Sequence, residues 1–518
     1  MIENEILHQA ILENPSDIDA RLVYGDWLAE HSDPRGDFIQ NEVAAGRSEK
    51  WSTQFADFLY RAQKIANEHR ESWSTGIEEI VENHQEKIKT PKAREKWVGK
   101  YQFPNPITYQ YRIGFADSFC FRYPPSDEYL SALMAVTPVR RLCFLKYNGQ
   151  HPLNTELLSR VGQFEFRVTD HCKNLNAVLG KKSKLNLEWL KIYASTGGQG
   201  RYSEEMQALA KLIAGSNCLH NLRSFNINAP GFGVSGVKRL VESNAFANLR
   251  SLTLVEGDFG DEGFSVLLNS DVIGQLKHLK VKLTGIGDAG FQHLAESGAK
   301  NLKRLSMGWW YGSNPSSKGF SAITSSPDLA GLYHLDLQGW PMGEDCFRLL
   351  CESESLSGIR ILNLANTDLD DTMAERLANS NFRLRCLNLE ANPKLTAKGF
   401  QLIADSPIVN ELTWLNLRDS LWGSAATKTI AASTKLKELR YLSMAKTGLD
   451  STDVARLLRA DNLSQLRELD LSSNDLQPKA LNECIRSPTL QTIRLTGSKV
   501  SEKLEKKLTE RFHAGAIF

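Results

Sequence analysis

Three aspartates lie close together near the N-terminus, at Asp26, Asp33 and Asp37, with Arg35 among them. Clustered carboxylates can act as a general acid–base pair, as in glycosidases, or bind a metal ion. No histidine or second metal-type ligand is placed to complete either site. Asp33 instead begins an Asp-Pro-Arg-Gly segment, in which a carboxylate ordinarily accepts hydrogen bonds from turn and helix N–H groups. We therefore predict a capping and turn role.

Other motifs that could support catalysis or cofactor binding do not have the required spacing. Residues 197–200 read Gly-Gly-Gln-Gly, but no Lys-Ser/Thr follows, so we predict a surface insertion rather than a phosphate-binding loop. The sequence contains no HExxH motif, nucleophile elbow or kinase motif set. The eight cysteines include no CxxC pair, which favours thiols in a reducing compartment. We predict no enzyme activity, no metal and no cofactor.

Composition restricts the class of partner. The 518 residues carry 62 basic and 61 acidic side chains, a formal net charge of +1, which disfavours a large basic surface for nucleic acid. No stretch approaches the roughly 20 apolar residues of a membrane span. The first ten residues contain Glu3 and Glu5 and no apolar run, unlike a secretory signal. These features predict a cytoplasmic protein.

An L-x-x-L-x-L pattern recurs twelve times, with central residues 24 to 35 positions apart. Each copy continues into a segment with helical spacing, such as residues 287–297. One unit cannot bury its own apolar face, so neighbouring units must stack into a continuous core. The central residues are Leu190, Phe225, Leu252, Leu279, Leu305, Leu335, Leu362, Leu387, Leu415, Leu442, Leu469 and Ile493.

Residues 185–500 resemble leucine-rich repeats of the ribonuclease-inhibitor type. The resemblance implies an α/β solenoid with a curved parallel sheet inside and helices outside. The asparagine that usually follows the strand is present only at Asn392 and Asn474. Thr or Ser replaces it in neighbouring copies and can still donate to backbone carbonyls, whereas Trp310 and Trp340 occupy it in two others and should point inward.

The N-terminal segment reads R-L-V-Y-x-D-W-L-x-E from Arg21 to Glu30, followed by D-P-R-G-x-F-I from Asp33 to Ile39. These residues closely resemble the bacterial, mainly planctomycete, repeat-companion domain, a small all-α module that lies beside repeat arrays. The resemblance implies an architecture but no biochemical activity. We expect helical faces formed by Ile6, Leu7, Ala10 and Ile11, by Leu22, Val23, Trp27 and Leu28, and by Phe38 and Ile39.

Five segments are therefore predicted. They are a repeat-companion helical module at 1–46, a helical extension and linker at 47–100, degenerate N-terminal capping repeats at 101–184, leucine-rich repeats at 185–500, and a C-terminal capping helix at 501–518.

Side chains that flank the strand leucines should face the concave surface, because strand side chains alternate. We predict that this surface binds a protein or peptide, with the N-terminal module docking or tethering. Regulation of a partner enzyme, as by GTPase-activating repeat proteins, and a purely structural array are alternatives. The sequence specifies neither the partner nor the oligomeric state. The candidate contact residues are Trp189, Lys191, Tyr193, His278, Lys280, Lys282, Arg304, Trp309, His334, Asp336, Asn363, Asn388, Trp414, Asn416 and Tyr441.

Overall fold

The computed structural model describes residues 4–48, 53–73, 77, 79–80, 107–112, 115–121, 124–147, 149, 153–168, 172–194, 202–228, 230–308, 315–420, 422–512 and 516–517. The chain forms two compact units. The N-terminal unit comprises residues 1–44 and 69–275, and the C-terminal unit comprises residues 45–68 and 276–518.

The N-terminal unit combines a helical module with the first strands of the repeat array. Strands β2 to β7 pair in parallel in chain order, and β1 pairs with β2 in the antiparallel direction. The strands are β1 Ile107–Arg112, β2 Phe115–Phe121, β3 Arg141–Tyr147, β4 Gln163–Val168, β5 Trp189–Ala194, β6 Ser224–Asn228 and β7 Ser251–Val255. The helices are α1 Glu5–Glu13, α2 Ile18–Glu30, α3 Pro34–Arg47, α7 Asp127–Val136, η1 Cys172–Leu175, α8 Asn176–Leu179, α9 Tyr202–Ala214, α10 Gly233–Val241, η2 Asn244–Phe246, α11 Gly260–Leu268 and α12 Asp271–Gln275.

The C-terminal unit repeats the same strand-and-helix unit. Its strands pair in parallel in chain order from β8 to β17. They are β8 His278–Lys282, β9 Arg304–Gly308, β10 His334–Asp336, β11 Ile361–Asn363, β12 Cys386–Asn388, β13 Trp414–Asn416, β14 Tyr441–Ser443, β15 Glu468–Asp470, β16 Thr492–Arg494 and β17 Ala516–Ile517. The helices are α4 Thr53–Trp73, α13 Asp288–Ala295, α14 Ser317–Ser325, η3 Pro327–Leu329, α15 Gly343–Glu352, α16 Asp371–Ala378, α17 Ala397–Ala404, η4 Pro407–Val409, α18 Gly423–Ala432, α19 Ser451–Leu458, η5 Asp461–Leu463, α20 Pro478–Arg486 and α21 Glu502–Phe512.

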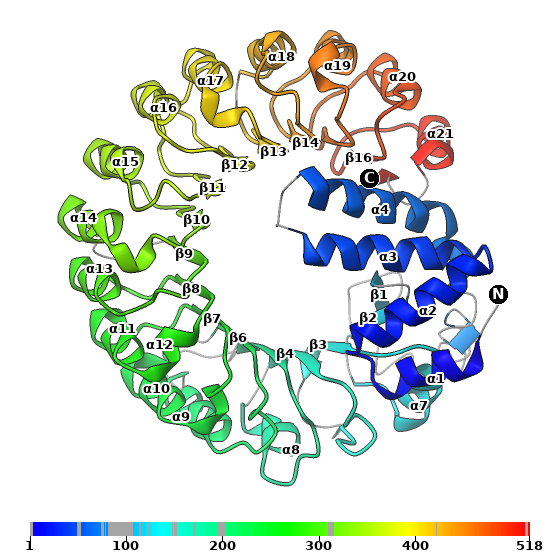
Figure 1. The fold of residues 1–518 in the computed structure, drawn as a ribbon, viewed down its shortest axis with the longest axis vertical. Coiled ribbons are helices and arrows are strands. Elements are labelled where there is room, and N and C mark those ends of the chain that lie inside the picture. The colour runs from blue at the N-terminus through cyan, green and yellow to red at the C-terminus, as the bar shows by residue number, and fades with distance from the viewer. Residues whose placement is uncertain are drawn as a thin grey trace. The chain divides into compact units, whose positions relative to one another are not determined.

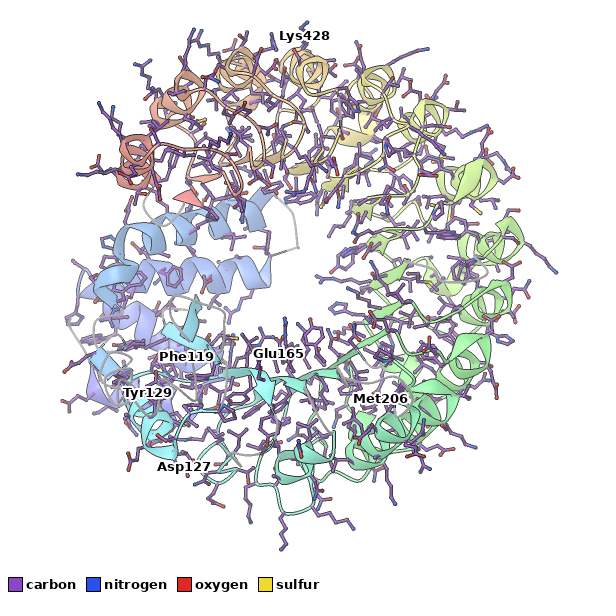
Figure 2. The ribbon with its side chains drawn as sticks, turned by 180° about the vertical axis from the view of Figure 1, so that it is seen from behind. Phe119, Asp127, Tyr129, Glu165, Met206 and Lys428 are labelled. Atoms are coloured by element: carbon purple, nitrogen blue, oxygen red, sulfur yellow. The ribbon has the colours of Figure 1, made fainter. Side chains whose placement is uncertain are left out.

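The repeat leucines form the core between strands and helices. In both units the strands line the concave side and the repeat helices lie outside (Figure 1). Leu335, Leu362 and Leu387 occupy one register row on β10, β11 and β12, and each is at most 1% exposed. Figure 2 shows Glu165 on the inner side of its strand and Lys428 on the outer side of α18. The chain is therefore an α/β leucine-rich-repeat solenoid.

The degenerate repeats keep the register of the regular ones. Phe119, Leu142, Phe164 and Leu190 pair in one row across β2 to β5, and all are buried. Strand β2 is an inner strand of the sheet, because it pairs with β1 on one side and β3 on the other. The additional strand β1 makes a hairpin that shields this end of the sheet.

The asparagine position has the expected role where asparagine is present. The Asn392 side chain accepts hydrogen bonds from the N–H groups of Thr367 and Leu369 and donates to the carbonyls of Leu364 and Leu389. Thr367 Oγ1 donates to the Leu364 carbonyl, as predicted for the threonine substitutes. Trp340 points inward and is 1% exposed, with its ring edge-on to Phe320, whereas Trp310 lies outside the described residues.

The helical module packs on the first parallel strand through a buried charge. The guanidinium of Arg21 on α2 lies 3.6 Å from the Asp117 carboxylate on β2, and both side chains are at most 1% exposed. Arg140 reaches the same carboxylate at 3.3 Å. Beside this cluster, the Phe115 ring stacks on Tyr24, with centroids 5.8 Å apart. Two residues of the N-terminal motif, Arg21 and Tyr24, therefore join the module to the repeats.

The predicted apolar faces of the module are partly wrong. Ile6 is 83% exposed and Val23 is 54% exposed, although both were assigned to buried faces. The buried face of α2 instead contains Arg21, Tyr24 and Leu28. The helix is rotated relative to the apolar pattern because its inward face must present Arg21 to Asp117.

The acidic cluster near the N-terminus has the predicted turn chemistry. Asp33 accepts hydrogen bonds from the backbone N–H of Arg35 at 2.9 Å and from its guanidinium at 2.8 Å. Asp26 accepts a hydrogen bond from the Gln40 amide. Both carboxylates are thus engaged within the module. The Gly-Gly-Gln-Gly loop at 197–200 lies outside the described residues.

The C-terminal end of the array is covered by α21. Leu504, Leu508 and Phe512 are spaced four residues apart and are buried. After this helix β17 pairs in parallel with β16, a final strand that the sequence pattern did not indicate. Among the described residues, no helix combines the length and apolar character needed to cross a bilayer.

Candidate protein-binding surface

Two rows of side chains follow the concave face of the C-terminal unit, one on each side of the central leucines. The row before the leucines contains Arg304, His334, Ile361, Cys386, Trp414, Tyr441, Glu468 and Thr492. The row after them contains Ser306, Asp336, Asn363, Asn388, Asn416, Ser443, Asp470 and Arg494.

The first row contains a continuous apolar strip, which we define as Ile361, Cys386, Trp414 and Tyr441. The Trp414 and Tyr441 rings are parallel within 4° and stacked, with centroids 4.8 Å apart. Both are half-buried, so they are less open than the sequence predicted. Ile361 is 4% exposed and Cys386 is 8% exposed, so Trp414 and Tyr441 are the part of the strip that a partner can reach.

The second row is polar and internally hydrogen-bonded. Asn363 donates to Asp336 at 2.9 Å, and Ser306 donates to the same carboxylate at 2.5 Å. Asn416 donates to Glu390 at 2.9 Å. The row therefore presents a pre-organised set of amides and carboxylates beside the apolar strip. Asn416 is only 7% exposed, so its amide orients the Glu390 carboxylate and is poorly accessible to a partner.

The basic candidate residues on β8 are only partly accessible to a partner. Lys282 lies 2.9 Å from Asp336 and is 6% exposed, which contradicts its assignment as a surface contact residue. Lys282 lies on β8 and Asp336 lies on β10, so the ion pair spans two strands and holds the lysine side chain against the sheet. Burial would raise the pKa of Asp336, but Lys282 and the hydrogen bond from Ser306 bring it below its ordinary value. His278, Lys280 and His334 are half-buried.

Arg304 is held in place by the neighbouring repeat. Its Nε donates to the Tyr333 hydroxyl at 2.8 Å, and its guanidinium lies 5.6 Å from the centroid of the Tyr333 ring. The half-buried side chain keeps its charge at the β9 end of the first row. Trp309, the other aromatic candidate nearby, lies outside the described residues.

A helix from the N-terminal part of the chain lies on the C-terminal end of this face. Asp57 of α4 is 2.8 Å from Arg440, and Gln63 donates to Thr492 at 2.7 Å. Burial, followed by the charge of Glu468, raises the pKa of Tyr60 on the same helix. Figure 1 shows α4 in blue beside β16. Ala62 of this helix is 1% exposed, whereas Leu59 is 37% exposed.

A second cluster lies on the concave side of the N-terminal unit. The Arg141 guanidinium lies 3.8 Å from the Trp189 ring centroid. Lys191 is paired with Glu165 at 3.2 Å and lies 4.6 Å from the Tyr193 ring centroid. The structure thus brings together the three predicted residues Trp189, Lys191 and Tyr193. It adds Arg141 and Glu165, which the sequence reading missed because they lie in degenerate repeats.

The residues described by the structure contain no group of three or more His, Cys, Asp or Glu side chains arranged to hold a metal ion. The aromatic, amide and charged side chains of the two concave faces are suited to contact with polypeptide, since aromatic and arginine residues are common interface anchors.

A match to a family model agrees with the repeat assignment. A family model described as Leucine Rich repeat matches residues 463–481, which include β15 and Asn474. No curated protein sequence matches the chain significantly. The chain is similar to one in the crystal structure of the yeast Rad7 and Elc1 complex, with 16% identity, 61% of this chain and 81% of that chain covered, and a TM-score of 0.43. It is also similar to an internalin (inlF) from Listeria monocytogenes, with 15% identity, 76% and 89% coverage, and a TM-score of 0.29.

Proposed function

We propose that the protein is a non-catalytic scaffold that binds a protein or peptide on the concave face of its repeats. The observation that carries the proposal is the position of α4, a polypeptide helix held on this face by Asp57–Arg440 and Gln63–Thr492. A surface that holds one helix through an ion pair and an amide contact has the chemistry to hold another. The strands β8 to β13 offer the remaining face for a partner.

The proposed contact area joins the apolar strip to the polar row. Trp414 supplies an aromatic anchor, Asn363 and Asn388 supply amides, and Arg304 supplies a positive charge. Mixed surfaces of this kind favour a protein over a lipid or a polyanion, because a partner must match both signs of charge. The cluster of Trp189, Lys191 and Tyr193 is a second contact area in the same proposal.

The proposal also covers the type of the module, the type of the repeats, and the origin and location of the protein. We infer that the module at 1–46 is of the repeat-companion type, that the repeats are of the ribonuclease-inhibitor type, and that the protein is bacterial and cytoplasmic. We also propose that the chain divides after the module into segments at 47–100, 101–184, 185–500 and 501–518. The buried Arg21–Asp117 contact supports a docking role for the module, since it joins the signature motif to the repeat sheet.

Site-specific photocrosslinking tests the binding surface. A photoreactive residue at Asn388 should capture a discrete partner, whereas one at the exposed Lys428 on the outer side of α18 should not. A third position, Ile6, reports on the module because it is 83% exposed. Capture from Ile6 alone would assign binding to the module and overturn the proposal.

Affinity for the captured partner then supplies the quantitative test. Interface anchors typically contribute ~2 kcal/mol or more each, so Arg304→Ala with Trp414→Ala should weaken binding by about 700-fold. Lys428→Ala is the control, and the melting temperature should change little in both. Unchanged affinity in the double variant would contradict the assignment.

A further inference from the structure

Two cysteines face one another on the first two parallel strands. Cys120 of β2 and Cys143 of β3 are register partners. Their sulfur atoms are 2.9 Å apart, with Cys120 donating a hydrogen bond to Cys143. No disulfide joins them. Adjacent strands hold the two backbones close enough for the Cα separation that a disulfide requires.

The two thiols differ in access to solvent. Cys143 is 8% exposed, while Cys120 is half-buried. The hydrogen bond with Cys120, together with burial, raises the pKa of the Cys143 thiol. A raised pKa keeps this thiol protonated at neutral pH and slows its own attack on an oxidant. Cys120 is therefore the sulfur that a soluble oxidant reaches first.

We propose that Cys120 and Cys143 are a modification site, a thiol pair that a small-molecule disulfide oxidises to an intrachain disulfide. The Cys120 thiolate attacks one sulfur of oxidised glutathione, forming a mixed disulfide and releasing one glutathione thiolate. The Cys143 thiol gives its proton to the released glutathione thiolate and attacks the Cys120 sulfur, and the second glutathione leaves as a thiolate that takes up the proton lost from Cys120. Two cysteine thiols are oxidised and one glutathione disulfide is reduced to two thiols.

The bond would fix the junction between the helical module and the repeats. Strand β2 also carries Asp117, which binds Arg21 of the module. A disulfide between residues 23 positions apart removes conformational freedom from the unfolded chain. Direct neighbours on parallel strands are not an ideal disulfide geometry, and strained disulfides are more readily reduced. The pair would therefore form a covalent cross-link that reductants can reverse.

Mass spectrometry of the oxidised full-length protein tests the proposal. After treatment with oxidised glutathione, alkylation and tryptic digestion without reductant, peptides 113–122 and 142–146 should appear as one species that lacks two hydrogens and separates on reduction. Cys346 and Cys351, on the same helix α15, serve as the internal control and should be alkylated. Stable glutathione adducts on Cys120 with no linked peptide would overturn the proposal.

A thermal measurement supplies an independent readout. The oxidised parent should melt at a higher temperature than the reduced parent, and dithiothreitol should abolish the shift. Cys120→Ser should show no dependence on oxidant, with circular dichroism confirming that it is folded. An equal oxidant-dependent shift in Cys120→Ser would assign the effect to other cysteines and contradict the proposal.

Discussion

Arg21 of α2 and Asp117 of β2 lie 3.6 Å apart with both side chains at most 1% exposed. Burial, opposed by the charge of Asp117, lowers the pKa of Arg21 to about 10. The arginine also donates to the Pro15 carbonyl at 2.8 Å. The buried carboxylate of Asp117 on β2 explains why the buried face of α2 contains an arginine.

Removing the shared carboxylate should cost more than removing one arginine. Asp117→Asn leaves Arg21 and Arg140 facing one another without a negative charge, and we expect a loss of about 3–5 kcal/mol in the free energy of unfolding. Arg21→Met leaves Asp117 paired with Arg140 and should cost less. Hydrogen exchange in residues 18–30, with denaturant unfolding, measures both. A larger effect from Arg21→Met would contradict the shared-carboxylate arrangement.

The repeat core predicts a strong contrast between two leucines. Leu387 is fully buried, whereas Leu402 on α17 is 37% exposed. Leu387→Asp places a charge among apolar side chains and should destabilise the protein by several kcal/mol, on the order of 4. Leu402→Asp, the matched control, should change stability by less than about 1 kcal/mol. Loss of hydrogen-exchange protection over residues 360–415 in the first variant alone is the expected result.

The sequence predicted the strand register because a leucine period specifies which side chains meet in the core. Leu387 pairs with Leu362 and Leu415, as the alignment requires. Asn392 could be predicted for the same reason, since its amide serves backbone groups of its own and the preceding repeat.

Contacts between distant segments could not be read from the pattern. The Asp57–Arg440 pair joins residues that no repeat period relates, and either side chain alone resembles an ordinary surface charge. Lys282 was assigned to the surface for the same reason, because its partner Asp336 lies two repeats further on. Periodicity specifies which face a side chain occupies but not which charge will neutralise it.

The Lys282–Asp336 pair predicts a specific dependence of stability on pH. The pKa of Asp336 is lowered in the folded protein, so its contribution is complete above the ordinary aspartate value of about 3.9 and is lost as pH falls through the lowered value. Asp336→Asn should cost about 3 kcal/mol at pH 7, because Lys282 is then buried without its carboxylate. The difference from the parent should shrink in acid.

Asp419→Asn is the control for this measurement. Asp419 also pairs with a lysine at 2.9 Å, but both side chains are exposed, so its loss should cost less than about 1 kcal/mol at any pH. Urea unfolding from pH 7 to pH 2.5 compares the two variants. A difference for Asp336→Asn that grows toward low pH would contradict the lowered pKa.

The position of α4 predicts that one helix face controls its attachment. Asp57→Lys places a positive charge beside Arg440, whose side chain is 5% exposed, and should release residues 53–68 from the repeat face. Repulsion replaces an attraction at a half-buried site, so hydrogen exchange in α4 should accelerate about tenfold, which corresponds to ~1.4 kcal/mol of local stability. Gln54→Lys adds a lysine at an exposed position of the same helix and should leave exchange unchanged. Equal acceleration in both variants would mean that helix propensity, rather than the Asp57–Arg440 contact, holds α4 in place.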